Sequence, residues 1–188
     1  MMKATALTIP GVQLLEPHVH RDERGYFAEL WRAHQFGPKT GAPGFVQANQ
    51  SSSQRNVLRG LHLQSPHGQG KLIQVLQGRI FDVAVDVRRG SPTFGQHLSL
   101  ELDAGELRQL YLPPGIAHGF LVLSERAHIQ YLCTEYYRPE CEIGLAWDDP
   151  DLGIAWPLAD AAPVLSEKDR RWPRLNALAH GQLPEFDA

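Results

Sequence analysis

The chain has 188 residues, which is enough for one domain with a hydrophobic core and marginal for two. Hydrophobic residues make up 43% of it and charged residues 21%, as in an ordinary globular protein. The formal net charge of −3, without a basic stripe, argues against a general nucleic-acid binder and against a protein of the membrane surface. We therefore expect a single domain over residues 1–188, in which any phosphorylated ligand meets a local cationic pocket.

The cysteines and the N-terminus indicate the compartment. Cys133 and Cys141 are the two cysteines, and their spacing fits neither a disulfide framework nor a thiolate metal cluster. The first residues, MMKATALTIPG, lack the apolar core of a signal peptide, and no apolar run approaches the length of a membrane span. These features predict a reduced, cytoplasmic location with no membrane partner.

Short apolar runs, separated by many of the 17 glycines and 14 prolines, predict a β-rich domain. In chain order, the segment DERGYFAE (22–29) predicts a charged turn and a strand, QANQSSS (47–53) is a polar run, and two strand-like runs flank a loop within 58–78. In 80–87, Phe81, Val83, Val85 and Val87 share one parity, whereas Asp82 and Asp86 share the other. Further strands are predicted at 98–102, 109–112, 119–123 and 129–134, and a short helix or two within 166–179. This spacing of strands favours a sandwich or barrel, most simply a jelly roll.

The segment LRGLHLQSPHGQGKLIQVLQG (58–78) carries the strongest functional signal. It sets Arg59, His62 and Lys71 around one short loop, which supplies an anion anchor, a proton acceptor and a cation for an oxyanion. Such a set suits the removal of a proton from carbon beside a carbonyl on a phosphorylated substrate. The alternative is three polar side chains on the solvated face of a hairpin.

A second motif, PPGIAHGF (113–120), places His118 after a proline–glycine turn. The pattern PxGxxH occurs in cupins, where the histidine often binds a metal together with two further histidines and a glutamate. Here the partner motif reads His62-Leu63-Gln64, so the ligand count is too low for a good divalent-metal site. A buried, hydrogen-bonded histidine is the alternative for His118.

Two further segments are ambiguous when taken alone. Tyr131 lies in the alternating run HIQYLCT and shares parity with Tyr137, so both could face one cavity, although tyrosines on a sheet are usually packing residues. The segment LSEKD (165–169) supplies Lys168 and Asp169, which an isolated reading would assign to a solvated helix start.

Taken together, DERGYFAE, QANQSSS, NVLRGLHLQ, QGKL, FDVAVDVR, SPTFGQ, PPGIAHGF and LSEKD closely resemble the dTDP-4-dehydrorhamnose 3,5-epimerase family, in the family's order and over residues 3 to 176. The resemblance implies a cupin-type jelly roll, usually a homodimer, that needs no metal or organic cofactor. It implies action on a dTDP-sugar, dTDP-4-dehydro-6-deoxy-D-glucose, in dTDP-rhamnose biosynthesis.

The resemblance also implies individual roles. His62 matches the family's proton acceptor, Tyr131 its proton donor, Asp169 the carboxylate that pairs with the histidine, and Lys71 the cation near the C4 oxygen. Substrate-binding positions are matched by Arg24, Glu29, Gln47, Asn49, Arg59, His118, Tyr137, Glu142 and Lys168. In the family the N-terminal segment reaches the neighbouring subunit's site, so Arg24 and Glu29 are expected to act across the dimer. Ala48 and Cys141 are local variations that affect recognition more than chemistry.

The chemistry agrees with these residue types. C3 and C5 both lie beside the C4 ketone, and inversion requires a base on one face of the ring and a proton donor on the other. Histidine is largely neutral at pH 7, and tyrosine remains protonated there. Four alternatives stay open from the sequence: an epimerase of C3 or C5 alone, a nucleotide-sugar ketoisomerase, a metal-dependent cupin, and a non-catalytic sugar-nucleotide binder.

Overall fold

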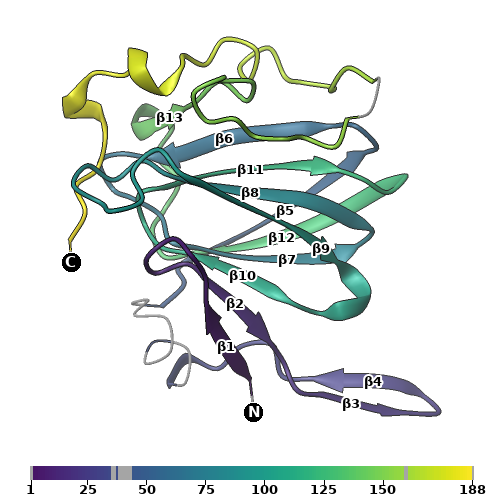
Figure 1. The fold of residues 1–188 in the computed structure, drawn as a ribbon. Helices are drawn as coiled ribbons and strands as arrows, with labels where there is room; N and C mark the ends of the chain where they lie inside the picture. The colour runs from purple at the N-terminus through teal and green to yellow at the C-terminus, as the bar shows by residue number, and fades with distance from the viewer. Residues whose placement is uncertain (1, 35–36, 38–43, 159–160, 188) are drawn as a thin grey trace.

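The computed structural model describes residues 2–34, 37, 44–158 and 161–187, and its strands form two facing antiparallel sheets (Figure 1). The larger sheet has the order β1-β2-β10-β7-β12-β5 and the smaller one β13-β6-β11-β8-β9. The larger sheet comprises β1 (Lys3–Ala6), β2 (Gln13–Glu16), β5 (Gln47–Gln54), β7 (Lys71–Gln77), β10 (Gln109–Leu112) and β12 (Arg126–Cys133). The smaller sheet comprises β6 (Leu58–Gln64), β8 (Arg79–Asp86), β9 (His97–Asp103), β11 (Ile116–Val122) and β13 (Glu142–Gly144). The all-β prediction is confirmed.

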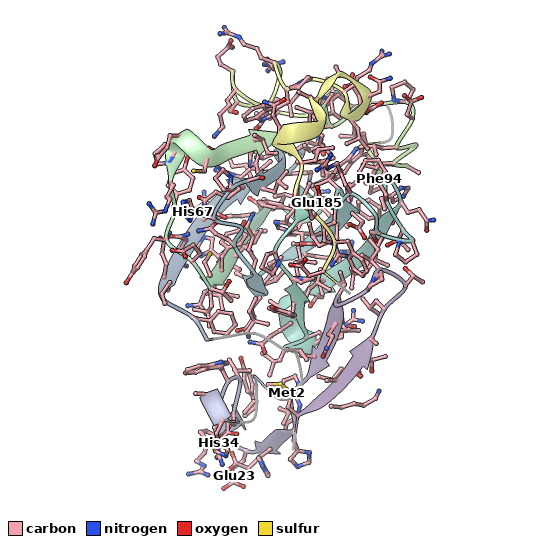
Figure 2. All side chains as sticks on the ribbon, turned by 90° about the vertical axis from the view of Figure 1, so that its left-hand side faces the viewer. Met2, Glu23, His34, His67, Phe94 and Glu185 are labelled. Carbon is pink, nitrogen blue, oxygen red and sulfur yellow. The ribbon has the colours of Figure 1, made fainter. Side chains whose placement is uncertain are left out.

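A separate hairpin, β3 (Val19–Asp22) with β4 (Gly25–Ala28), extends from the N-terminal edge of the larger sheet (Figure 1). Figure 2 places Glu23, in its turn, at the end of the molecule opposite the C-terminal segment. Its aromatic side chains are free of the core: Tyr26 is 59% exposed and Phe27 is 71% exposed. The predicted turn and strand at 22–29 are therefore present, but they project away from the body of the chain.

The main core lies between the two sheets. Its members are buried aliphatic and aromatic side chains from both sheets, including Ile73, Leu110, Ile80, Phe120 and Ile129. Burial of such side chains is the main force that holds two sheets face to face.

The outer face of the smaller sheet is covered by the chain that follows β13. Val83 and Val85 pack there against Leu145, Leu152 and Leu183. Figure 1 shows this C-terminal segment running along β6 and β13. The alternating apolar residues of 80–87 therefore lie on the outer face of β8. Asp82 lies on the other face, which is turned to the space between the sheets, and it is fully buried.

The helical prediction for residues 166–179 is fulfilled only by a 3-10 turn, η3 (Leu175–Ala177). Pro173 lacks a backbone donor and its ring clashes with the preceding helical turn, so a continuous helix cannot pass through it. The remaining 3-10 turns are η1 (Ala104–Glu106), η2 (Pro139–Cys141) and η4 (His180–Gln182). Among the described residues, no helix is long and apolar enough to cross a membrane.

Candidate active site

A cavity of about 630 Å³ opens between the two sheets and under the C-terminal segment. The larger sheet contributes side chains of one parity, because alternate residues of a strand face the same side. From β5, β7 and β12 these include Gln47, Asn49, Lys71 and Tyr131. The smaller sheet contributes His62 and His118, which are cross-strand partners on β6 and β11. The cavity is completed by Arg59, Tyr137, Glu142, Lys168 and Asp169, together with Val57, Leu58, Phe120, Val164, Leu165 and Ser166.

Arg59 and His62 line the same cavity although they are three residues apart on β6. A regular strand would turn them to opposite faces, but the pairing of β6 with β11 shifts by one residue between His118 and Phe120. Gly60 has a φ of +133°, and a Cβ there would lie 2.5 Å from the Cα of Gly119. A glycine pair at this crossing therefore lets the two strands approach closely and brings the arginine and the histidine together.

His62 is held by a carboxylate from the C-terminal segment. Its Nε2 lies 2.6 Å from Oδ1 of Asp169, which is 4% exposed. Burial alone would raise the pKa of Asp169, but the hydrogen bond and the charge attraction to His62, with smaller contributions from Ser166 and Trp172, together outweigh it and leave the pKa below its ordinary value. Asp169 is thus an anion at neutral pH that fixes one ring nitrogen of His62 and leaves the other available to a substrate.

Tyr131 comes from the opposite sheet. Its hydroxyl lies 3.3 Å from Oγ of Ser51 on β5, and its ring meets that of His118 edge-on, with centroids 6.1 Å apart. Burial, more than any other influence, raises the pKa of Tyr131. The phenol is therefore protonated throughout the physiological range and can act as a donor.

A second histidine–carboxylate pair lies deeper between the sheets. Nε2 of His118 is 2.9 Å from Oδ2 of Asp82, and both residues are buried. The sequence analysis identified His118 as a candidate but not Asp82. An aspartate that alternates with apolar residues on a buried strand is expected to face inward and to be paired.

Lys71 enters the cavity from β7. Its Nζ donates to the carbonyl oxygen of His62 at 3.3 Å, so the ammonium group lies next to the histidine strand. Desolvation lowers the pKa of Lys71, while Glu142 and Asp82 oppose that effect. With three donors on one nitrogen, Lys71 retains capacity for an oxygen of a ligand.

The mouth of the cavity carries a hydrogen-bonded polar chain. Lys168 Nζ donates to Oε2 of Glu142 at 2.7 Å, and the Tyr137 hydroxyl donates to the same oxygen at 2.6 Å. That bond, more than burial, raises the pKa of Tyr137 to about 12. Oε1 of Gln47 accepts from the backbone N–H of Tyr137 at 2.8 Å, and Arg59 donates to Ser53 at 3.0 Å.

The structure therefore brings together every residue predicted for the site except two. Arg24 and Glu29 lie on or beside the projecting hairpin, where Arg24 pairs with Asp22 and Glu29 pairs with Arg32. Sequence reasoning missed Ser51, although it follows Gln47 and Asn49 at the two-residue spacing of one strand face. Within the described ranges, no group of three or more histidine, cysteine, aspartate or glutamate side chains could hold a metal ion.

Comparisons with known proteins identify similar sequences and structures. Residues 6–177 match the family model described as dTDP-4-dehydrorhamnose 3,5-epimerase. A curated dTDP-4-dehydrorhamnose 3,5-epimerase from Pseudomonas aeruginosa is 53% identical over 171 residues, which is 90% of this chain and 94% of the relative.

Solved structures agree with the fold. A dTDP-6-deoxy-D-glucose-3,5-epimerase from Legionella pneumophila, in complex with dTDP-4-keto-L-rhamnose, has a TM-score of 0.96 and 45% identity, with both chains covered completely. A 3'-monoepimerase from Streptomyces bikiniensis, in complex with dTDP-quinovose, has a TM-score of 0.89 and 40% identity, and covers 95% of this chain and 91% of its own.

Proposed function

The chain belongs to the dTDP-4-dehydrorhamnose 3,5-epimerase family, and we propose that its cavity inverts C3 and C5 of dTDP-4-dehydro-6-deoxy-D-glucose by proton transfer between His62 and Tyr131. The protein is an isomerase, and its product is dTDP-4-dehydro-L-rhamnose, in dTDP-rhamnose biosynthesis. One observation carries the assignment of roles. An imidazole and a phenol enter a single cavity from two facing sheets, as inversion of a carbon centre requires.

His62 is the base. The C4 ketone acidifies the protons on both neighbouring carbons, and the ring nitrogen that is not engaged by Asp169 accepts each proton in turn. Asp169 then stabilises the imidazolium that forms, in the manner of the aspartate of a catalytic triad.

Tyr131 is the donor on the opposite face. Its raised pKa keeps the phenol protonated until the basic enolate carbon takes the proton. Lys71 stabilises the negative charge that develops on the C4 oxygen, because its ammonium group lies beside the strand of the base.

The cations and hydrogen-bonding groups near the mouth suit a nucleoside diphosphate. Arg59 presents a fork suited to paired phosphate oxygens, and Lys168 adds a second positive charge on the facing segment. The donors and acceptors for the sugar and the nucleobase are supplied by Gln47, Asn49, Tyr137 and Glu142. His118 supports the ring of Tyr131.

The site is completed by a second copy of the chain. Arg24 and Glu29 match binding positions of the family but lie on a hairpin that leaves the body, next to the exposed rings of Tyr26 and Phe27. A hairpin that exposes large aromatic side chains suits exchange between protomers. A homodimer in which each hairpin enters the partner's cavity would account for both features. The free, buried thiols of Cys133 and Cys141 suit the reduced cytoplasm, which is the location we propose.

Mixing two inactive variants tests this exchange. In a heterodimer of Arg24→Ala and His62→Ala chains, one site would carry both defects and the other neither. Random exchange should therefore restore roughly a quarter of the wild-type activity, since half the dimers are mixed and each has one intact site. If mixing and subunit exchange restore nothing above the sum of the parents, Arg24 acts within its own chain.

A second candidate function is epimerisation at one carbon alone. It is favoured by the similarity to the Streptomyces bikiniensis monoepimerase, whose fold is shared over nearly the whole chain. Because both reactions need the same base and the same ketone, the two differ in whether the donor reaches the second carbon.

The configuration of the product distinguishes the two functions. Purified protein is incubated with dTDP-4-dehydro-6-deoxy-D-glucose, and proton couplings at C3 and C5 are followed by NMR. We expect both centres to invert in the wild type, no turnover in His62→Ala, and impaired inversion in Tyr131→Phe. Normal inversion by Tyr131→Phe would remove the phenol from the mechanism, and a product inverted at one centre would establish the second candidate.

A further inference from the structure

Trp172 lies behind the His62–Asp169 pair and outside the cavity lining. It follows Asp169 by three residues in the C-terminal segment. Its ring meets the imidazole of His62 edge-on, with centroids 6.0 Å apart and an interplanar angle of 64°. The indole is therefore placed to limit rotation of the imidazole.

The indole packs against a backbone position that only glycine allows. A Cβ on Gly144 would lie 2.5 to 2.7 Å from three atoms of the Trp172 ring system. Gly144 belongs to β13, and its cross-strand partner is His62 itself. The ring of Trp172 thus rests on the strand that pairs with the base, at the level of the base.

Nε1 of Trp172 is buried and makes no hydrogen bond of standard geometry within the described part of the chain. Trp172 contributes least among the groups that lower the pKa of Asp169. Contact of the ring with His62 is therefore the main means by which Trp172 supports the pair.

Asp169 sits on an irregular turn. Its backbone N–H donates to Oγ of Ser166 at 3.1 Å, and the Ser166 side chain also helps to lower the pKa of the carboxylate. Lys168 lies over the Trp172 ring at 5.7 Å while it pairs with Glu142, so the same indole also supports the polar wall at the mouth.

We propose that Trp172 is a positioning residue for proton abstraction: its ring buttresses the His62 imidazole and keeps it in line with the Asp169 carboxylate. This inference rests on the proposed role of His62 as base. It assigns no contact between Trp172 and the substrate.

The substitution Trp172→Leu tests this role. Leucine keeps an apolar side chain near Gly144 but removes the ring that meets the imidazole. Loss of an edge-on aromatic contact predicts a fall in kcat of roughly 2- to 12-fold. KM should change less than about twofold, because the residue does not touch the substrate. Trp156→Leu is the matched control: its ring meets that of Phe81 edge-on, with centroids 5.8 Å apart and away from the cavity, so kcat should stay unchanged.

A double-mutant cycle gives the readout that a merely structural role would not produce. In an Asp169→Asn background, Trp172→Leu should lower kcat by less than about twofold, because the carboxylate with which the ring aligns the imidazole is gone. An equal loss in both backgrounds, or wild-type kcat in the single variant, would overturn the inference. If His62→Ala and Asp169→Asn retained wild-type turnover, the proposed function itself would fail, and this outcome is distinct from a failure confined to Trp172.

Discussion

Replacing Asp169 by asparagine removes the charge that orients and stabilises the base while it preserves the size of the side chain. The Nε2–Oδ1 distance of 2.6 Å identifies a short, charge-assisted contact once His62 takes up a proton. Coulomb's law gives about 4 kcal/mol for unit charges 4 Å apart at an effective dielectric constant of ~20. Because the His62 side chain is 25% exposed, solvent screens part of this interaction, and hydrogen bonds to charged groups contribute about 1.5–3 kcal/mol. A loss near ~3 kcal/mol in the transition state corresponds to a fall in kcat of about 10²-fold.

The assay is steady-state turnover of the dTDP-4-keto sugar at pH 7, with folding verified by thermal unfolding. Asp149→Asn is the matched control, since Asp149 is also buried in the C-terminal segment and accepts from the backbone of Leu175 at 2.8 Å. It should lower stability and leave kcat unchanged below its Tm. A folded Asp169→Asn protein with kcat within threefold of wild type would refute the pairing as a catalytic element.

Three predictions concern stability. Burial would raise the pKa of Asp86, but hydrogen bonds from Arg88 and two hydroxyls outweigh it and leave the pKa below its ordinary value. The resulting stabilisation is present above the unfolded-state pKa of about 3.9 and is lost as the pH falls through the lower folded-state value. Asp86→Asn should therefore lower the free energy of unfolding, measured with urea, by ~3–5 kcal/mol at pH 7 and by progressively less below about pH 4. A loss of stability that does not change with pH would contradict this role of Asp86. Leu110→Ala, at a fully buried core position, should lower the free energy of unfolding by ~2–5 kcal/mol with an unchanged m-value. A loss under about 1 kcal/mol would show that the core collapses around the gap. Gly78→Ala should unfold at a lower temperature than Gly153→Ala, since both glycines have positive φ but the new Cβ lies 2.1 Å from a carbonyl oxygen in the first and in open space in the second. Equal Tm values would exclude that clash.

Local patterns predicted most of the apolar strands and missed the polar strand β5. Gln109–Leu112 was predicted with the bounds observed. The predicted run at 98–102 lies within β9, and the predicted run at 129–134 overlaps β12. β5 is a strand with almost no apolar residues, so periodicity of hydrophobicity could not identify it. Its polar face is explained by the cavity that it lines.

The site depends on contacts between distant segments. His62 and Asp169 are 107 residues apart, and no pattern of spacing joins them; the family resemblance did. Alternation alone would also have separated Arg59 from His62, because the one-residue shift in pairing depends on the close approach of Gly60 and Gly119. The proposed exchange of hairpins between two protomers would explain the exposed position of Arg24, and local patterns in the sequence do not predict that position.

Incubation in deuterium oxide, with both ring positions followed by NMR, tests the central claim most directly. With dTDP-4-dehydro-6-deoxy-D-glucose, solvent deuterium should appear at C3 and at C5 in the wild type and at neither carbon in His62→Ala. Deuterium entering both carbons at wild-type rates in His62→Ala would show that another group removes these protons.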